Sequence, residues 1–500
     1  MRDHSPITLE QFNGLWSRGS IEETPMDHFT DCSNIKFVGS SGFASRDGID
    51  RHQSVAVPLA HILRMYNYPT SDKNTILVLT TGGNIYHIVD SATIFGPILT
   101  IAAMTDFGFA PYNGRAYITP FTTEVVGGLN RERGLTGEFV YVYLGDGTNA
   151  RKAGNVKPTT PLVVANDGPG LTDAGVHIFG YVFETNTGYQ SAPGGLVAFT
   201  TNALNSLDFS SVAIDATPGS PVTKRHIVAS KVIQAYNGDV NGYQLFFIPS
   251  ATIPNNVGTT LNGISFFDQD LLLDASHLSD NLANIPAGVN LVVYHNRMCC
   301  MTEFDNISLV RVSHVGEPES FSAIDGICLV PPDGNPVTNA AELRDVLYVT
   351  KRNKTVSFVD NGDEPSSWPL TVVDNGVGAG VHSIATVLDA GSASVDYLLI
   401  GAYKGLILFN GRYILPELSW KIQQFWLNMD FNHSFRKIQI VNDTVDQVVY
   451  LVTTDGRILY GNYANGLDPK STQWSPWQFD VQINTLCLIN VNELLIGSEL

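Results

Sequence analysis

Short runs of β-branched and aromatic residues recur along most of the chain, and each run ends at glycine, asparagine or aspartate. Such runs favour strands, and the residues that close them favour tight turns. Helical periodicity is almost absent; its best matches are residues 8–16 and 340–344. The pattern predicts an all-β protein with strands over residues 75–79, 84–89, 115–119, 139–144, 346–350, 397–400, 406–409, 448–453 and 457–460.

Three stretches share one format, in which an apolar strand is followed by a glycine or Asp-Gly turn and a second strand with tyrosine or phenylalanine. They are ILVLTTGGNIYHI at 76–88, YLLIGAYKGLILF at 397–409 and VVYLVTTDGRILYG at 448–461. A hairpin-rich unit of about 40 to 50 residues is typical of a propeller blade, whose small sheet buries both faces against its neighbours. The sequence therefore predicts a β-propeller and leaves the number of blades open.

The spacing of the strands changes over residues 157–275. Strands of six to nine residues follow one another there, over roughly the length of one sandwich domain of about 100 residues. We expect an immunoglobulin-like or fibronectin-III-like β-sandwich inserted into the propeller; two irregular blades are the alternative. The predicted organisation is an N-terminal entry segment at 1–30, a first part of the propeller at 31–156, the inserted sandwich at 157–275 and the rest of the propeller at 276–500.

Charge is scarce in this chain and mostly negative. The sequence holds 29 Lys and Arg against 48 Asp and Glu, for a formal net charge of −19. This balance argues against a protein that grips nucleic acid by neutralising phosphates. The sequence lacks an apolar run long enough to cross a bilayer and a recognisable secretory signal, so we expect no membrane anchor and folding in a cytoplasm.

The five cysteines predict neither a disulfide framework nor a zinc knuckle, because their number is odd and no CxxC pair is present. Cys299 and Cys300 are neighbours on an expected strand and should point to opposite faces of its sheet.

Motifs that carry chemistry are missing from the sequence. It has no phosphate-binding GxxxxGK[ST] loop, no HExxH pair and no GxSxG elbow. We therefore predict no catalytic, cofactor-binding or metal-binding residues and no enzymatic activity. A propeller glycosidase is the main enzymatic alternative, because it needs only two carboxylates across a central cleft. The candidate carboxylates are Asp146, Asp325, Asp374 and Asp455, although Asp146 and Asp455 stand in Asp-Gly turns that explain them structurally.

Several short motifs follow one another in an order that resembles tailed-bacteriophage structural proteins. Near the N-terminus the motifs include Asn34 before the first expected strand, and Arg46 and Gly48 in SRDGI. Further along the chain stand YVYLGDGT at 141–148, GYVFETNTGYQSAP at 180–193 and EPESF at 317–321. The chain is most similar to propeller tail proteins of the packaged-DNA stabilisation and tail tubular protein B (nozzle) families. It departs from them at Asp47, where proline is common, and in its shorter length.

The residues of these motifs have structural explanations. Arg46 could close a hairpin by pairing with a carboxylate, Gly48 could supply a positive φ, and Asp146 with Gly147 could form a type I′ turn. We expect these residues, together with Asn34, to be structural rather than reactive.

The resemblance implies a virion protein of the tail: a head-to-tail connector, nozzle or hub subunit in a homo-oligomeric ring, commonly hexameric or dodecameric. Other tail, adaptor or portal proteins would be its partners, and genomic DNA would pass through the ring without specific binding. The excess carboxylates could line that channel and repel DNA. A glycan-binding receptor adhesin is the third functional class that remains open.

Overall fold

The computed structural model describes residues 15, 17, 29, 33–38, 42–46, 61–70, 75–90, 93–126, 129–202, 204–216, 220–255, 258–389, 395–431, 433, 436–489 and 493–498. Strands dominate this part of the chain, and its single α-helix is the short α1 (Gln423–Leu427). The prediction of an all-β protein is confirmed.

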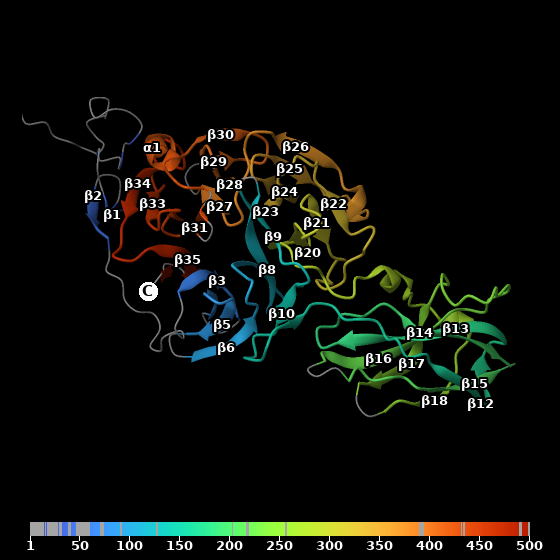
Figure 1. The fold of residues 1–500 in the computed structure, drawn as a ribbon. Coiled ribbons are helices and arrows are strands. Elements are labelled where there is room, and N and C mark those ends of the chain that lie inside the picture. Colours follow the sequence, from blue (N-terminus) through green and yellow to red (C-terminus); the bar gives the residue numbers. More distant parts are fainter. Residues whose placement is uncertain are drawn as a thin grey trace, which may run out of the picture.

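Seven antiparallel sheets surround a common axis in the described part of the chain (Figure 1). The innermost strand of each sheet contacts the innermost strand of the next, and the last returns to the first. In order, these strands are β3 (Ile62–Asn67), β7 (Asp106–Tyr112), β19 (Asn290–Tyr294), β23 (Val337–Leu343), β27 (Ile384–Asp389), β31 (Gln439–Asp443) and β35 (Ile483–Ile489). This closed circle of sheets is a β-propeller, as predicted.

Each sheet continues from its inner strand towards the rim. The three repeated sequence stretches occupy the same two central positions of their blades, namely β4–β5, β28–β29 and β32–β33. The outer strands are β4 (Thr75–Thr80), β5 (Asn84–Val89) and β6 (Thr93–Thr100); β8 (Arg115–Val126), β9 (Leu129–Gly134), β10 (Tyr141–Tyr143) and β11 (Arg151–Lys152); β20 (Arg297–Met301), β21 (Leu309–Val312) and β22 (Ile327–Leu329); β24 (Val346–Lys351), β25 (Thr355–Phe358) and β26 (Leu370–Asp374); β28 (Val395–Ala402), β29 (Gly405–Phe409) and β30 (Ile414–Glu417); β32 (Val448–Val452), β33 (Ile458–Asn462) and β34 (Gln473–Trp477); and β36 (Glu493–Ser498).

Apolar side chains fill the space between neighbouring blades. All six residues of β4 and all five of β29 are buried, which explains why these strands are apolar on both faces. Cys299 and Cys300 on β20 belong to two different clusters, one towards the blade of β23 and one towards the blade of β7, as their neighbouring positions predicted.

Residues 340–344, one of the two best matches to helical periodicity in the sequence, do not form a helix. Residues 340–343 form the end of β23, which pairs with β24 through Ala340 and Val349, and Arg344 lies in the turn that follows. Alanine, glutamate and leucine favour a helix locally, but burial between two blades overrides this preference.

Both ends of the described chain meet at one place in the ring. The sheet of β35 and β36 lies between the blades of β31 and β3, where Thr485 Oγ1 accepts a hydrogen bond from Met65 N at 3.0 Å. Farther out, the hairpin of β1 (Ile35–Val38) and β2 (Gly42–Ser45) packs on β34, and Trp477 Nε1 donates to the Ile35 carbonyl at 2.9 Å. Most of the expected entry segment at 1–30 lies outside the described residues.

A separate two-sheet body is inserted between β11 and β19. One sheet has the order β12 (Val163–Thr172), β15 (Asn205–Ser210), β18 (Leu261–Ile264); the other has the order β14 (Gly194–Thr201), β13 (Gly175–Thr185), β16 (Val222–Ala229), β17 (Phe246–Pro254). Phe179, Phe209 and Ile227 share one buried cluster between the two sheets. This part of the predicted insertion is therefore a sandwich rather than two blades; its membership of the immunoglobulin or fibronectin class stays a prediction.

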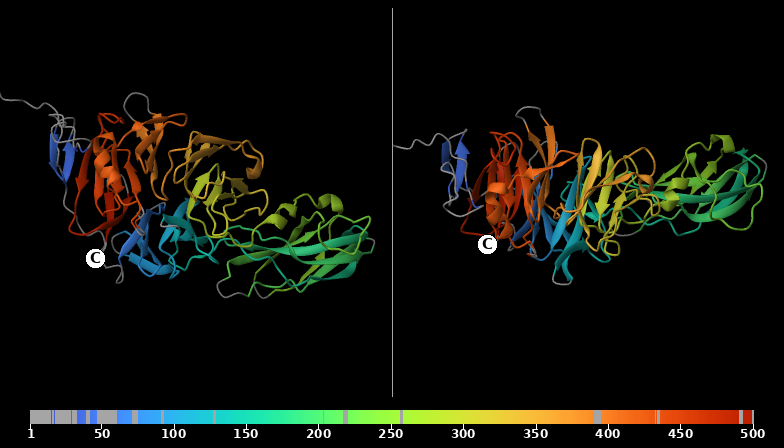
Figure 2. Two further views of the ribbon diagram at one scale, coloured as in Figure 1. Left: turned by 45° about the horizontal axis from the view of Figure 1, so that its top comes forward. Right: turned by 90° about the horizontal axis from the view of Figure 1, so that it is seen from above.

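The sandwich projects sideways from the rim of the propeller (Figures 1 and 2). Two 3₁₀ turns, η2 (Asp268–Asp270) and η3 (Ser276–Asp280), lead from its last strand back to β19. Two more, η4 (Pro365–Ser367) and η5 (Trp420–Ile422), lie in the propeller.

Glu319 fastens the sandwich to the propeller. This carboxylate is 2% exposed, pairs with Arg151 Nη1 at 3.1 Å and accepts a hydrogen bond from Gly154 N at 2.8 Å. Arg151 Nη2 in turn donates to Thr187 Oγ1 in the sandwich at 2.8 Å, and Tyr189 OH donates to the Leu282 carbonyl at 2.9 Å. The motif at 317–321 is thus a turn that anchors the inserted domain.

Candidate functional site

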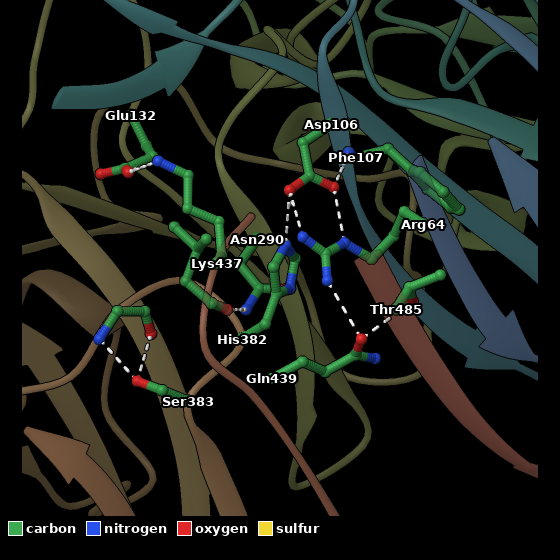
Figure 3. A network of polar contacts seen from close by, with 12 residues as sticks. Arg64, Asp106, Phe107, Glu132, Asn290, His382, Ser383, Lys437, Gln439 and Thr485 are labelled. Atoms are coloured by element: carbon green, nitrogen blue, oxygen red, sulfur yellow. Dashed lines mark hydrogen bonds and ion pairs between the residues drawn. The ribbon is translucent and has the colours of Figure 1, made fainter. Parts of the chain in front are cut away.

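Polar side chains meet at the propeller axis, where the inner strands come closest (Figure 3). Because each blade contributes its own residue, the positions are spread over more than 400 residues of sequence. They are Arg64 on β3, Asp106 on β7, Asn290 on β19, Asn339 on β23, Gln439 on β31 and Thr485 on β35, with His382 and Ser383 just before β27.

A buried ion pair forms the centre of this network. Arg64 Nε donates to Asp106 Oδ1 at 2.9 Å, and Arg64 Nη2 donates to Oδ2 at 2.8 Å. Arg64 is fully buried and Asp106 is 4% exposed. Burial of either charge alone would cost several kcal/mol, so the two-bond geometry is what makes both tolerable at the axis.

His382 completes the centre of the network. Its Nε2 lies 2.9 Å from Asp106 Oδ2, and its Nδ1 lies 2.9 Å from the Tyr66 hydroxyl. Burial and then the positive charge of Arg64 lower the pKa of His382. The ring is therefore neutral, with Nε2–H donating to Asp106 and Nδ1 accepting from Tyr66.

Asp106 remains ionised in these surroundings. Burial by itself would raise the pKa of its carboxyl, but Arg64 and His382 hold that pKa well below its usual range. The backbone N–H of Phe107 also donates to Oδ1 at 2.9 Å. Both carboxylate oxygens are thus occupied by at least two donors each.

Gln439 joins the ion pair to the blade that closes the ring. Its Oε1 accepts from Arg64 Nη1 at 3.1 Å, from Thr485 Oγ1 at 2.8 Å and from Leu486 N at 3.0 Å. Its Nε2 donates to the Leu486 carbonyl at 2.8 Å. One amide side chain thereby connects the first, sixth and seventh sheets.

On the other side of the axis, Asn290 and Asn339 hydrogen-bond to each other and to the same backbone carbonyl, that of Val381. Asn290 Nδ2 donates to Asn339 Oδ1 at 2.9 Å, and Asn339 Nδ2 donates to the Val381 carbonyl at 2.8 Å. Lys437 pairs with Glu132 at 2.6 Å near the mouth of the axis. The described axis is therefore filled by side chains that hydrogen-bond to one another and link the inner strands of different blades.

Two of the residues singled out in the sequence come together at the N-terminal hairpin. Arg46 Nε donates to Asn34 Oδ1 at 3.1 Å, and Gln478 N donates to the same oxygen at 2.9 Å. Arg46 also lies over the ring of Phe479 at 4.2 Å. Asn34 and Arg46 thus fix the hairpin of β1 and β2 to the chain after β34, whereas Gly48 lies outside the described residues.

The expected type I′ turn at Asp146 and Gly147 is wrong. Both central residues of such a turn need positive φ, and Asp146 is not among the residues with positive φ, although Gly145 (79°) and Gly147 (81°) are. The strands β10 and β11 are joined by a longer loop, residues 144–150, in which Asp146 Oδ1 accepts from Thr148 N at 3.0 Å. The role of Asp146 is therefore to stabilise its own loop.

The four carboxylates of the glycosidase alternative lie on four different blades, and three of them have local partners. Asp374 Oδ1 accepts from Val377 N at 2.6 Å, and Asp455 Oδ2 accepts from Arg457 Nε at 2.8 Å. Asp146 accepts from Thr148, and Asp325 uses its backbone carbonyl to accept from Ser366 N at 3.0 Å.

His295, Glu342 and Asp345 are the residues whose geometry best suits a cation. One ligand atom from each lies within 4.8 Å of the others. His295 lies in the turn between β19 and β20, and Glu342 and Asp345 come from the end of β23 and the turn that follows it in the next blade, a spacing that no local sequence motif reveals. Nothing else among the described residues points to an ion there, so we assign no metal.

No helix in the described part of the chain is long and apolar enough to span a membrane.

Comparison with known proteins adds no family. No family model matches the chain, and no curated protein matches it. Solved structures that align with it include BBS1N in complex with ARL6DN (9% identity, 81% of this chain and 90% of that chain, TM-score 0.28) and Kluyveromyces lactis Hsv2 (11% identity, 84% and 98%, TM-score 0.30). Likeness at these scores carries no argument, and the propeller is assigned from its own sheets.

The positive φ of Gly147 and its close contact with Phe95 both predict that Gly147→Ala destabilises the protein. Its φ is 81°, and an added Cβ would lie 2.8 Å from the ring of Phe95. Gly114 has a similar φ of 75° with open space around it. Positive φ costs alanine about 1–2 kcal/mol, so Gly114→Ala should lose about that much stability and Gly147→Ala clearly more. Urea unfolding measures both, and equal losses would contradict the packing of this loop on Phe95.

His87 lies beneath the same loop and predicts a pH effect on stability. Its Nδ1 lies 2.7 Å from the Tyr143 hydroxyl, its Nε2 has no partner among the described residues, and burial lowers its pKa to about 4. In the unfolded chain His87 is protonated as the pH falls below about 6.5, whereas in the folded chain it is protonated only below about pH 4. Stability should therefore be complete above about pH 6.5 and fall as the pH drops through this window, by up to about 1.4 kcal/mol per pH unit.

The variant His87→Phe isolates this contribution, because phenylalanine keeps the ring packing and removes the titrating nitrogen. The free energy of unfolding, measured between about pH 7 and about pH 5, should fall less steeply for this variant than for the wild type. Parallel slopes would refute the assignment.

Proposed function

We propose that the chain is a ring-forming structural protein of a bacteriophage tail, placed as a connector, nozzle or hub in the virion. The proposal begins with the ordered motifs at 34–48, 141–148, 180–193 and 317–321. Three of these motifs have structural roles. The motif at 34–48 fixes the N-terminal hairpin, the motif at 141–148 leads from β10 towards β11 beside the insertion, and the motif at 317–321 anchors the sandwich.

The hydrogen-bonded junction between the sandwich and the propeller is the observation that carries the proposal. Arg151 bridges Glu319 in the propeller and Thr187 in the sandwich, and Arg115 Nη1 adds a hydrogen bond to the Thr187 carbonyl at 3.0 Å. An assembly protein benefits from such a fixed second module, because tiers in a tail must keep their relative orientation. The sandwich would contact a neighbouring tier, an adaptor or a portal protein.

The surface of the chain also suits contacts between subunits. Only 15% of the residues are charged, and large apolar side chains are exposed at the rim and near the insertion, including Leu272 (82%), Ile324 (68%), Leu273 (66%) and Leu329 (62%). A cyclic oligomer uses two different surfaces of each subunit, and interface cores are poor in charge.

The filled axis constrains where DNA would pass. Arg64, Asp106 and His382 occupy the centre of the propeller itself, so a DNA channel would have to be formed between subunits, at the centre of the ring. With a net charge of −19, that surface would guide DNA without gripping it.

The glycosidase alternative has less support from the arrangement of carboxylates. The carboxylates considered for hydrolysis are dispersed over four blades, and Asp106, the carboxylate at the axis, is paired with Arg64. A hydrolase needs two carboxyl groups facing each other across a cleft.

The oligomeric state of the purified full chain tests the proposal. We expect rings of about six or twelve subunits of 54.4 kDa, seen by mass measurement and in negative-stain images. Because the contacts would be poor in charge, the rings should persist at about 1 M salt, where charge interactions are screened beyond about 3 Å. A monomer at every concentration and salt level would contradict the proposal, and glycan and glycoside screens would then test the alternatives.

A further inference from the structure

The outermost strand of the third blade, β22, has a free edge. Val330 N donates to the Ser308 carbonyl at 2.9 Å, which fixes the register of β22 against β21. Hydrogen-bonded and non-hydrogen-bonded pairs alternate along an antiparallel ladder, so the backbone groups of Ile327 and Leu329 point away from β21. Among the described residues, no backbone or side-chain group pairs with the outward N–H and C=O groups of these two residues.

A groove runs along this free edge. It has a volume of about 600 Å³ and lies between β22 and the next blade, where β25, η4 and β26 supply the opposite wall. In η4, Ser366 N already donates to the outward carbonyl of Asp325 at 3.0 Å, so the open part of the edge begins at Ile327. The groove therefore lies where one more strand would pair with β22.

The lining of this groove favours an uncharged, apolar peptide. Phe358 and Trp368 are buried in its wall, whereas Leu329 is 62% exposed beside it. The two charged residues of the lining pair with each other, since Arg311 Nη2 donates to Glu303 Oε2 at 3.1 Å. An open strand edge beside an apolar groove is the arrangement to which an extended peptide binds by strand addition.

A segment of the chain with this chemistry stands near the N-terminus. Residues 5–9 read Ser-Pro-Ile-Thr-Leu, carry no charge and place Ile7 and Leu9 at alternate positions. In a strand these two side chains would share one face. Residues 1–14 lie outside the described part of the chain.

This segment leaves the propeller on the side opposite the groove. Leu15 N donates to the Trp474 carbonyl on β34 at 3.0 Å, and β34 belongs to the sixth of the seven described sheets, three places from the sheet of β22 (Figure 1). Between Ile7 and Leu15 an extended chain spans at most roughly 26–29 Å. That length can cross to a neighbouring subunit, and a cyclic ring joins two different surfaces of each subunit.

We propose that residues 5–9 of one copy add as an antiparallel strand to β22 of the next copy in the ring. Ile7 lies opposite Leu329, and Leu9 lies opposite Ile327. Both pairs exchange backbone hydrogen bonds across the edge that is free in the single chain. The inference rests on the proposed function, because it assigns the contact between different surfaces that a cyclic ring requires.

The sequence of the segment suits this register. With Ile7 and Leu9 bonded to β22, the backbone groups of Pro6 and Thr8 face away from it. Proline has no N–H to donate, so Pro6 leaves no donor on the newly formed edge. A further strand is then less able to add there.

Disulfide trapping between two full-length variants tests the proposal. Ile7→Cys and Leu329→Cys, combined before assembly and oxidised mildly, should form a covalent dimer of the two variants. A hydrogen-bonded antiparallel pair has its Cα atoms about 5.5 Å apart, which suits a disulfide. The cysteines in the described part of the chain are buried and should not compete.

Val445→Cys is the matched control for Leu329→Cys. Val445 is 60% exposed, as Leu329 is at 62%, but it lies in the turn between β31 and β32, away from the groove. Combined with Ile7→Cys, this variant should give little covalent dimer. Equal yields from the two combinations would overturn the proposal.

A charged substitution tests the contact without cross-linking. Leu329→Lys should raise the subunit concentration at half-assembly at least about tenfold, because it places a charge in an apolar contact. Val445→Lys should assemble like the wild type. The urea midpoint of unfolding should stay unchanged in both, since both side chains are exposed.

The outcomes separate this inference from the proposed function. Rings that form without a disulfide between the Ile7→Cys and Leu329→Cys chains would overturn the inference and leave the proposed function standing. Disulfide-linked subunits that never close into a ring would support the strand addition and contradict the proposed function.

Discussion

The buried pair of Arg64 and Asp106 is the interaction on which this propeller depends most. A propeller brings the inner strands of all its blades to one axis, where backbone and side-chain groups lose contact with water. Here the axis holds two opposite charges joined by two hydrogen bonds, with His382 on the carboxylate and Gln439 on the guanidinium. Because these four residues come from four different blades, the pair is satisfied only when the ring is closed, so its desolvation cost enforces closure.

Much of the fold could be predicted from the local sequence, but the set of residues that meet at the propeller axis could not. At 76–88 and 448–461, apolar runs joined by glycine turns predict hairpins, and both hairpins occupy the two central positions of their blades. The spacing between Arg64, Asp106 and Gln439 follows no motif, because each blade supplies one residue. The available signal was a polar residue within or at the start of an otherwise apolar strand, such as Arg64 in ILRMYN, and it becomes informative only once the strands are known to be innermost.

Contacts that join the separate parts of the chain, rather than reactive groups, support the proposed role in assembly. The polar groups at the axis hydrogen-bond to one another, and the sandwich is anchored through Glu319. Asn34 and Arg46 join the N-terminal hairpin to the chain just after the outer strand β34. Such a body offers fixed surfaces for neighbours.

A double-mutant cycle on Arg64 and Asp106 tests the central claim most directly. The variants Arg64→Met and Asp106→Leu, alone and combined, would be compared by the free energy of unfolding in urea. Each single change should cost about 3–5 kcal/mol, because it leaves the partner charge buried and unpaired, whereas the double variant should cost far less than the sum. If the loss in the double variant equals the sum of the two single losses to within about 0.5 kcal/mol, the claim that this pair holds the ring is contradicted.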